Sequence, residues 1–302
     1  MARERKQLDL FTPSIVKPRL RDLTDAMDIC FLSLAKRRLK PIRYQNGKVS
    51  VLITANATYG MATIWDWDVI IGLVSMINES RNEDLWTSPR IGFPPYNLLE
   101  CIGRAKGGAN YHELAAAIHR LHFTGITTNI RLDDQHGEER PFSFIEDYRI
   151  PERYSAFGMA KCETVRPDPS RKWEVSLSPW VYNAVVRQNG ILSVDRAFLS
   201  LRGGVEKFLY RYARKAVPAS KGRWKIKIVK LFEKSGSCGN LYDFQKKVRE
   251  IACRNVLPGY RLELTGGGRD SLVWFFQDRP GAPQMSWPSS NPETVLDDHI
   301  PF

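Results

Sequence analysis

The stretch NLYDFQKKVREIA, residues 240–252, limits the possible folds more than any other part of the chain. Asn240 is a typical helix N-cap, and apolar residues from Leu241 to Ile251 recur at the spacing of one helical face, which predicts an amphipathic helix. Before it, VKLFEKSGS predicts a short helix that ends at Gly236. A short helix, a glycine-containing turn and a capped helix in this order are typical of a helix-turn-helix.

A glycine-rich hairpin is expected directly after this helix. The stretch YRLELTGGGRDSLVWFF alternates apolar and polar residues on both sides of residues 266–270, where glycines allow a tight turn. Upstream, EKFLYRYARKA predicts a first helix with its apolar residues on one side. Three helices followed by a hairpin are the order of a winged-helix domain, which presents its third helix to the major groove of DNA.

The first half of the chain repeats this order without repeating the sequence. WDWDVIIGLVSMINES and YNLLECIGR predict two helices, and NYHELAAAIHRLH predicts a third, with Asn110 as its N-cap and Glu113 as the capping-box partner. GITTNIRL and FSFIEDYRI then predict two paired strands around a polar loop. The predicted fold class is therefore α+β, with two tandem winged-helix domains.

Four segments are expected along the chain. The stretch VRPDPSRK has the prolines and charges of an interdomain linker, and the proline- and serine-rich C-terminal end lacks any periodicity. We expect a flexible N-terminal segment, a first winged-helix domain, a second winged-helix domain that binds DNA, and a disordered tail. In that order they cover residues 1–25, 26–164, 165–278 and 279–302.

Basic residues are concentrated in one part of the chain. The net charge is +12, and residues 201–260 contain fifteen Lys or Arg against four Asp or Glu. We interpret this excess as a surface patch, because a concentrated basic face is typical of proteins that bind nucleic-acid phosphates. Double-stranded DNA is the expected partner.

The DNA-binding residues are expected on the capped helix and the hairpin of the second half. The lysines and arginines there suit phosphate or guanine, and the glutamine amide suits adenine. The six candidates are Gln245, Lys246, Lys247, Arg249, Arg261 and Arg269.

The corresponding helix in the first half has a different free face. It carries His112, Glu113, Arg120 and alanines, which make a poor phosphate-binding surface. Such a face suits contact with protein better, so we expect residues 60–150 to hold the interface of any homodimer.

Several other classes of function are not favoured by the sequence. GRAKGG and GGGRDS lack the Lys-Ser or Lys-Thr of a phosphate-binding loop, and five scattered cysteines, interpreted as reduced and mostly buried, form no CxxC pair. HRLH is a poor ligand pair, because its leucine belongs to an apolar stripe. No signal peptide or apolar run of membrane-spanning length is evident. We therefore expect a cytoplasmic protein without catalysis, metal or cofactor.

Three segments resemble a known family. They are PIRYQNGKVSVLITANATYGMATIWDWDVIIGLVSMI, NLLECIGRAKGGANYHELAAAIHRL and LSLRGGVEKFLYRYARKA. They are similar to the replication initiator protein A family of bacterial plasmids. The resemblance implies tandem winged helices, binding to repeated sites at a plasmid origin and recruitment of host replication proteins, without intrinsic catalysis. It also implies that the C-terminal winged helix is the main reader of the repeat, while the N-terminal one mediates dimerisation or supplementary backbone contact. The alternative is a winged-helix transcriptional regulator, although such proteins often add a ligand domain, which is not evident here.

The pentapeptide QLDLF lies close to the N-terminus and is unusually apolar for a chain end. It resembles the motif by which many bacterial proteins bind the DNA polymerase sliding clamp. The resemblance implies that Gln7, Leu8, Leu10 and Phe11 bind the clamp, as an extended peptide in an apolar groove. The alternative is a short edge strand with its leucines packed on the first domain.

Overall fold

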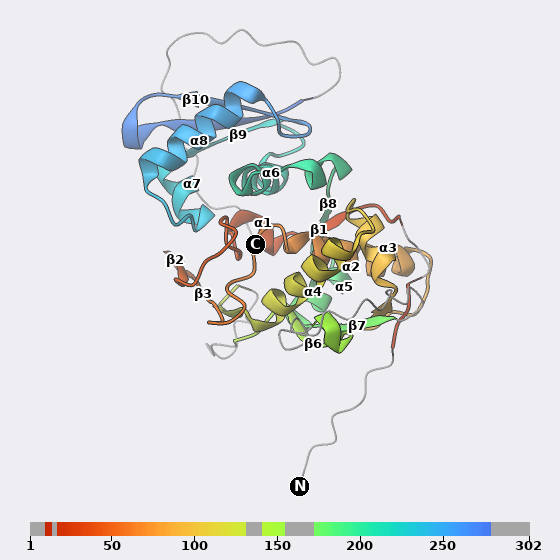
Figure 1. The fold of residues 1–302 in the computed structure, drawn as a ribbon. Coiled ribbons are helices and arrows are strands. Elements are labelled where there is room, and N and C mark those ends of the chain that lie inside the picture. Colours follow the sequence, from red (N-terminus) through yellow and green to blue (C-terminus); the bar gives the residue numbers. More distant parts are fainter. Residues whose placement is uncertain (1–9, 14–16, 131–140, 155–171, 279–302) are drawn as a thin grey trace.

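The computed structural model describes residues 10–13, 17–130, 141–154 and 172–278. Within these ranges the chain is a mixture of helices and small antiparallel sheets, so the α+β prediction is confirmed. Figure 1 shows two groups of elements. The group that contains α2 to α4 is called the first half below, and the group that contains α6 to β10 is called the second half.

The second half contains three helices and one three-stranded sheet. Its elements are α6 (Gly204–Ala216), β9 (Arg223–Lys227), α7 (Ile228–Ser235), α8 (Leu241–Arg254), β10 (Tyr260–Thr265), the 3₁₀ turn Gly268–Asp270 and β11 (Leu272–Gln277). The strand order is β10-β11-β9, so the last strand lies in the centre. The predicted succession of helices and hairpin is confirmed in this half.

The first half repeats both the element order and the sheet topology. The matching elements are α2 (Trp67–Asn82), β4 (Arg90–Phe93), α3 (Pro95–Cys101), α4 (Gly108–Phe123), β6 (Ile145–Arg149), the 3₁₀ turn Glu152–Tyr154 and β7 (Trp173–Leu177). One further strand, β5 (Gly125–Thr128), stands between α4 and β6 and has no counterpart between α8 and β10. The strand order is β4-β7-β6, and again the last strand lies between the other two. The repetition predicted from the order of elements therefore extends to strand pairing.

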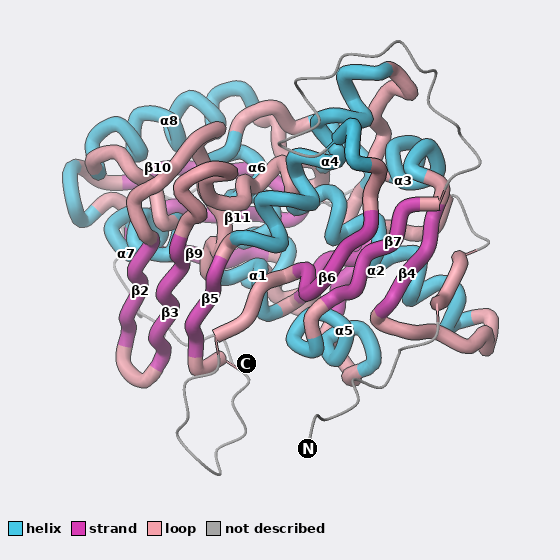
Figure 2. The backbone as a smooth tube through the Cα atoms, turned by 60° about the horizontal axis from the view of Figure 1, so that its bottom comes forward, coloured by secondary structure: helices cyan, strands magenta, loops and turns pink. Residues whose placement is uncertain are grey.

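The predicted hairpin of the first half is wrong in its pairing. Strand β5 (Gly125–Thr128) pairs with β3 (Val49–Thr54), which pairs with β2 (Ile42–Asn46), whereas β6 pairs with β7. A single bridge from Ile126 to Phe142 is the link between the two predicted strands among the described residues. Alternation in the sequence shows which face of a strand is buried, but it does not identify the neighbouring strand. Figure 2 shows β2, β3 and β5 side by side.

Elements on both sides of the expected boundary pack together. The boundary at residues 165–172 falls in the connection between β6 and β7, two strands of one sheet, and residues 155–171 lie outside the described ranges. Helix α5 (Pro179–Val186) packs on α2, and β8 (Ile191–Ser193) pairs with β1 (Arg21–Leu23). The expected flexible N-terminal segment thus ends in a paired strand. We propose that the second unit begins near Gly203, after the 3₁₀ turn Arg196–Ser200.

Local signals explain where the main helices begin and end. Asn240 caps α8, because its side chain accepts a hydrogen bond from the Asp243 backbone N–H at 2.8 Å. Gly236 ends α7 in the left-handed conformation, with φ of 59°. Helix α4 begins earlier than predicted, with Gly107 at its N-cap and Asn110 inside the first turn.

Buried ion pairs join the two halves. Asp22 pairs with Arg211 at 2.6 Å, and Asp68 pairs with Lys207 at 2.8 Å. A third pair links α1 (Asp25–Asp28) to α7 through Asp28 and Lys234, at 2.7 Å. Burial raises the pKa of the Asp68 carboxyl and lowers the pKa of the Lys207 ammonium, since a low-dielectric site disfavours both charged forms.

Candidate nucleic-acid interface

Helix α8 is held in place by its apolar face. Phe244, Val248 and Ile251 are buried, and the ring of Phe244 contacts that of Phe232 on α7, with 5.4 Å between centroids. The apolar spacing that predicts this helix is also what orients it, because the buried stripe turns the opposite stripe toward solvent.

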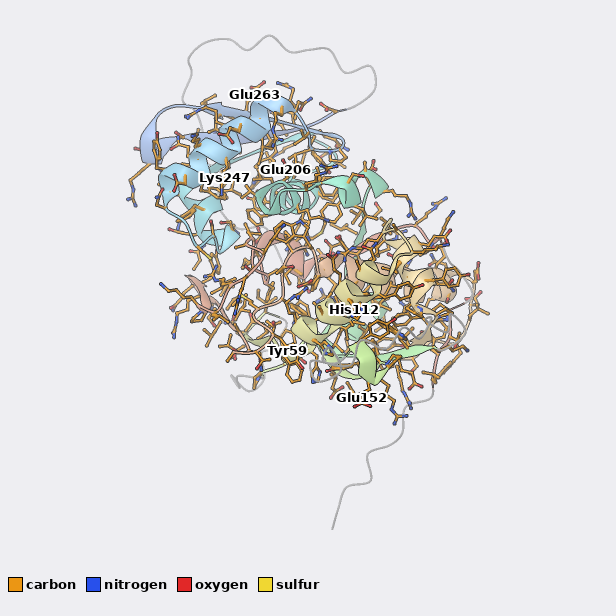
Figure 3. The ribbon with its side chains drawn as sticks, viewed as in Figure 1. Tyr59, His112, Glu152, Glu206, Lys247 and Glu263 are labelled. Carbon is orange, nitrogen blue, oxygen red and sulfur yellow. The ribbon has the colours of Figure 1, made fainter. Side chains whose placement is uncertain are left out.

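Three cations lie on the solvent-exposed surface of the helix, with Lys246 and Arg249 opposite the apolar stripe and Lys247 at its margin. Lys246, Lys247 and Arg249 are all exposed, and none of them forms an ion pair with another described residue. Arg254, one turn further along α8, is different because it pairs with Glu206 on α6. Figure 3 shows Lys247 on this helix. The three free cations form a positive surface that could bind a polyanion.

Gln245 does not belong to this surface. It is 8% exposed, and its amide Nε2 donates a hydrogen bond to the Ser271 hydroxyl at 2.8 Å. Its position places it beside the apolar stripe, one turn from both Leu241 and Val248, so its side chain faces the start of β11. The prediction that Gln245 reads adenine does not fit this geometry, and Gln245 is left out of the proposed interface.

The two arginines of the hairpin have different surroundings. Arg269 is exposed in the turn between β10 and β11, close to Gly268, whose φ is 59°. Arg261 lies on the outer face of the sheet, where it pairs with Glu263 and lies over the ring of Phe276 at 4.7 Å. Its neighbours Tyr260 and Leu262 are buried on the other face. Arg269 is therefore more accessible to a ligand than Arg261, which already contacts Glu263 and Phe276.

Not all of the basic excess in residues 201–260 is on the surface. Lys207 and Arg211 are each 1% exposed, and Lys234 is 6% exposed. The interpretation of this region as one surface patch is corrected by these three residues, whose charges pair with aspartates of the first half. A count of charges in the sequence cannot separate buried cations from exposed ones.

Helix α4 takes the place of α8 in the first half, but its charges are compensated. Arg120 forms two hydrogen bonds with the carboxylate of Asp66, at 2.8 and 2.7 Å. His119 is buried, with Nδ1 2.8 Å from the Tyr148 hydroxyl. His112 and Glu113 are exposed. Figure 3 shows His112 on this helix.

The N-terminal pentapeptide is described only in its last two residues, since Gln7 and Leu8 lie outside the described ranges. Phe11 is 5% exposed and pairs with the edge of β4: its N–H donates to the Arg90 carbonyl at 2.9 Å, and its carbonyl accepts from the Gly92 N–H at 2.7 Å. Leu10 is 40% exposed. The last residue of the motif is therefore docked on the first half.

Other expectations concern cysteines, metals and membranes. Cys30 and Cys101 are buried, whereas Cys238 and Cys253 are exposed, and Cys162 lies outside the described ranges. In the described part of the chain, no three His, Cys, Asp or Glu side chains come together as a possible metal site. No helix in these ranges combines the length and apolarity needed to cross a membrane.

Solved structures share this fold. The chain is similar to two crystal structures of domains 2 and 3 of RctB, with TM-scores of 0.60 and 0.52. Sequence identity is 12% and 11%; the matches cover 85% and 82% of this chain, and 99% and 95% of the RctB chains. At this identity the likeness shows the fold alone.

The family follows from the sequence comparison. Residues 21–262 match the model of the family described as Replication initiator protein A. A protein of Wigglesworthia glossinidia brevipalpis named "Putative replication protein" is 28% identical over 221 residues, which are 72% of this chain and 75% of the relative. The chain belongs to the replication initiator protein A family, and the resemblance noted in its sequence is confirmed.

Proposed function

We propose that the protein initiates plasmid replication by binding repeated double-stranded sites at the origin. In this proposal each half is a winged-helix domain, and α8 enters the major groove. The succession of α6, β9, α7, α8, β10 and β11 supports it, because a short helix and a turn precede the exposed helix and a hairpin follows it.

One observation carries the proposal: the exposed face of α8 holds three cations without an acidic partner among the described residues. Lys246, Lys247 and Arg249 can bind phosphates or guanine edges when the helix lies in a groove. Arg269 at the tip of the hairpin can reach the backbone beside it, and Arg261 makes a smaller contribution because it is already paired with Glu263.

A transfer assay tests the initiator role. A plasmid that carries this gene and its flanking DNA, but no other origin, should replicate in a bacterial host and should fail when Lys246, Lys247 and Arg249 are changed to alanine. A transcriptional regulator would bind the flanking DNA but would not support replication of the plasmid. Binding without replication therefore contradicts initiation and favours the regulator.

Helix α4 suits a contact between two copies of the protein. Its exposed positions include Ala109, His112 and the partly exposed Ala116, and its main cation, Arg120, is occupied by Asp66. We expect the first half to hold the interface of a homodimer. Sedimentation of the full chain should show less dimer after Ala116→Arg, and an unchanged dimer fraction would contradict this location.

Host recruitment can begin at the N-terminus. Gln7, Leu8, Leu10 and Phe11 match a sliding-clamp motif, and a clamp bound there would be concentrated at the origin by a short tether. Because Phe11 is docked on β4, clamp binding in this proposal requires the segment to leave that edge. A peptide of residues 1–16 should bind purified clamp, and changing Leu10 and Phe11 to alanine should abolish binding.

A further inference from the structure

A second basic surface lies on the first half of the molecule. Residues 36–48 read KRRLKPIRYQNGK and contain six Lys or Arg without one Asp or Glu. No acidic residue occurs between Asp28 and Asp66, so this is the longest stretch of uncompensated charge in the first half. We call residues 36–48 the basic strip.

The fold exposes most of the strip. Within β2, Ile42 and Tyr44 are 2% and 8% exposed, so the alternation of the strand turns Arg43 outward. None of the exposed cations forms an ion pair with a residue that the structure describes. These exposed cations are Lys36, Arg37, Lys40, Arg43 and Lys48. A solvated surface of ordinary kind would interleave both signs of charge.

The sixth cation fastens the strip to the turn before α8. Arg38 donates hydrogen bonds to the carbonyls of Lys40 at 2.8 Å and Pro41 at 3.1 Å, and to that of Gly236. Gly236 is also close to Ile42, because a Cβ built on this glycine would lie 2.9 Å from the isoleucine Cγ2. The strip is thus fixed against the end of α7. Figures 1 and 2 both show β2 on the same side of the molecule as α7.

This attachment sets where the charges lie relative to bound DNA. In helix-turn-helix proteins, the helix before the recognition helix crosses the DNA backbone. The strip is anchored at the turn that joins α7 and α8, so it lies beside the helix that crosses the backbone in such proteins. Lysine and arginine side chains are long enough to reach phosphates from such a position.

We propose that the basic strip binds the phosphate backbone of duplex DNA, beside the groove that α8 enters. The inference rests on the proposed function, since it takes its orientation from α8. It makes the first half a direct contributor to DNA affinity, through β2 and the preceding loop and not through α4. It also predicts a footprint that continues past one end of the segment covered by α8.

The test compares two triple variants of the full chain with equal loss of charge. Arg37→Ala, Lys40→Ala and Arg43→Ala remove strip cations and leave Arg38 in its structural role. The control changes exposed cations elsewhere on the first half: Arg19→Ala, Arg149→Ala and Lys172→Ala. The probe is a duplex of about 40 bp selected from random sequence by the wild-type protein, and the same duplex cut to about one helical turn around the selected site.

The strip variant should bind the long duplex at least tenfold more weakly than the control at moderate salt. Its slope of log affinity against log salt should be shallower by about 0.9 for each phosphate that the variant no longer neutralises. Both variants should bind the short duplex equally. Equal binding of the long duplex by both variants, or a wild-type hydroxyl-radical footprint that ends with the short site, would overturn the inference.

The same experiment separates this inference from the proposed function. If the wild type selects no duplex, or if changing Lys246, Lys247 and Arg249 has no effect, the role of α8 fails. If α8 behaves as proposed and the strip variant equals the control, only the strip fails. The footprint needs no variant, so a folding defect in either triple variant still leaves a decisive measurement.

Discussion

Helices α4 and α8 occupy equivalent places in two halves that share element order and strand order, yet their charges are used differently. On α4, Arg120 is held by Asp66, whereas on α8 three cations are exposed without a described partner. The comparison teaches that topology places a helix at a surface, but side-chain pairing decides whether that surface can bind phosphate. Similar folds therefore do not imply similar roles for the two halves.

The largest expected effect concerns the joint between the halves. Arg211→Ala would leave Asp22 buried beside an empty site, with its Oδ1 still accepting from the Trp67 indole N–H at 2.7 Å. We expect the free energy of unfolding of the full chain to fall by about 3–5 kcal/mol, as for other broken buried pairs. Urea denaturation measures it.

An exposed pair supplies the control for the joint. Lys230 on α7 pairs with Glu233 at 3.5 Å, and the two side chains are 37% and 46% exposed. Lys230→Ala should lower the free energy of unfolding by less than about 1 kcal/mol. If Arg211→Ala and Lys230→Ala lower the free energy of unfolding by the same amount, the buried pairs do not hold the two halves together.

The next effect tests the difference between α8 and the rest of the basic surface. Changing Lys246, Lys247 and Arg249 together to alanine should weaken DNA binding at least a hundredfold, which is about 2.7 kcal/mol. The salt dependence should become shallower by about one unit of slope for each phosphate that the helix no longer binds. Fluorescence anisotropy on the selected duplex measures both quantities.

Two control variants sharpen this prediction. The Arg19, Arg149 and Lys172 triple variant removes the same charge elsewhere and should lose much less affinity. His112→Ala changes the exposed face of α4 and should leave DNA binding almost unaltered. A loss in His112→Ala equal to that in the α8 variant would mean that the two helices share one role.

Much of the second half could be predicted from the sequence, because its signals are local. Asn240 caps its helix and Gly236 ends the one before it, and each acts within a few residues of itself. The pairing of β5 with β3 and of β7 with β4 could not be predicted, since it joins segments that are far apart in the sequence. A pattern of alternation carries no information about the partner strand.

The candidate site was predictable to a similar degree. The outward face of α8 follows from its apolar stripe, so Lys246, Lys247 and Arg249 could be placed from the sequence. The burial of Lys207 and Arg211 depends on aspartates more than a hundred residues away, and it could not be inferred from local charge. The basic strip was visible as a run of cations without acids, but its position beside α8 required the structure.

A smaller effect tests whether Gln245 belongs to the protein core or to the DNA-binding surface. Gln245→Ala would remove the hydrogen bond to Ser271, whose hydroxyl is buried at the start of β11 and also donates to the Gly268 carbonyl at 3.0 Å. We expect a loss of about 1–2 kcal/mol in the free energy of unfolding, with base preference unchanged. A changed base preference at one position, with unchanged stability, would return Gln245 to the DNA interface.

The smallest effect concerns the N-terminal segment. The first half of the molecule holds this segment through Phe11, and the clamp is proposed to bind the same segment. Trp86 is 58% exposed and meets the ring of Phe11 edge to face, with 6.5 Å between centroids. Trp86→Ala should loosen this docking and raise the affinity of the full chain for purified clamp about two- to tenfold, because such ring pairs contribute about 0.5–1.5 kcal/mol. Leu85→Ala is the matched control, since Leu85 is also exposed but has no ring.

The edge of β4 and the proposed groove of the clamp both bind Phe11, so they compete for it. This competition makes the clamp proposal testable. A peptide of residues 1–16 has no β4 edge to occupy, so it should bind the clamp more tightly than the full chain does. In calorimetric titration, the affinity of the Trp86→Ala full chain for the clamp should lie between that of the peptide and that of the wild-type full chain. Equal affinity of peptide and full chain would mean that docking of Phe11 does not oppose clamp binding. No binding by either, together with a loss of stability in Phe11→Ala, would assign Phe11 to the core of the first half, where β4 and Trp86 already cover it.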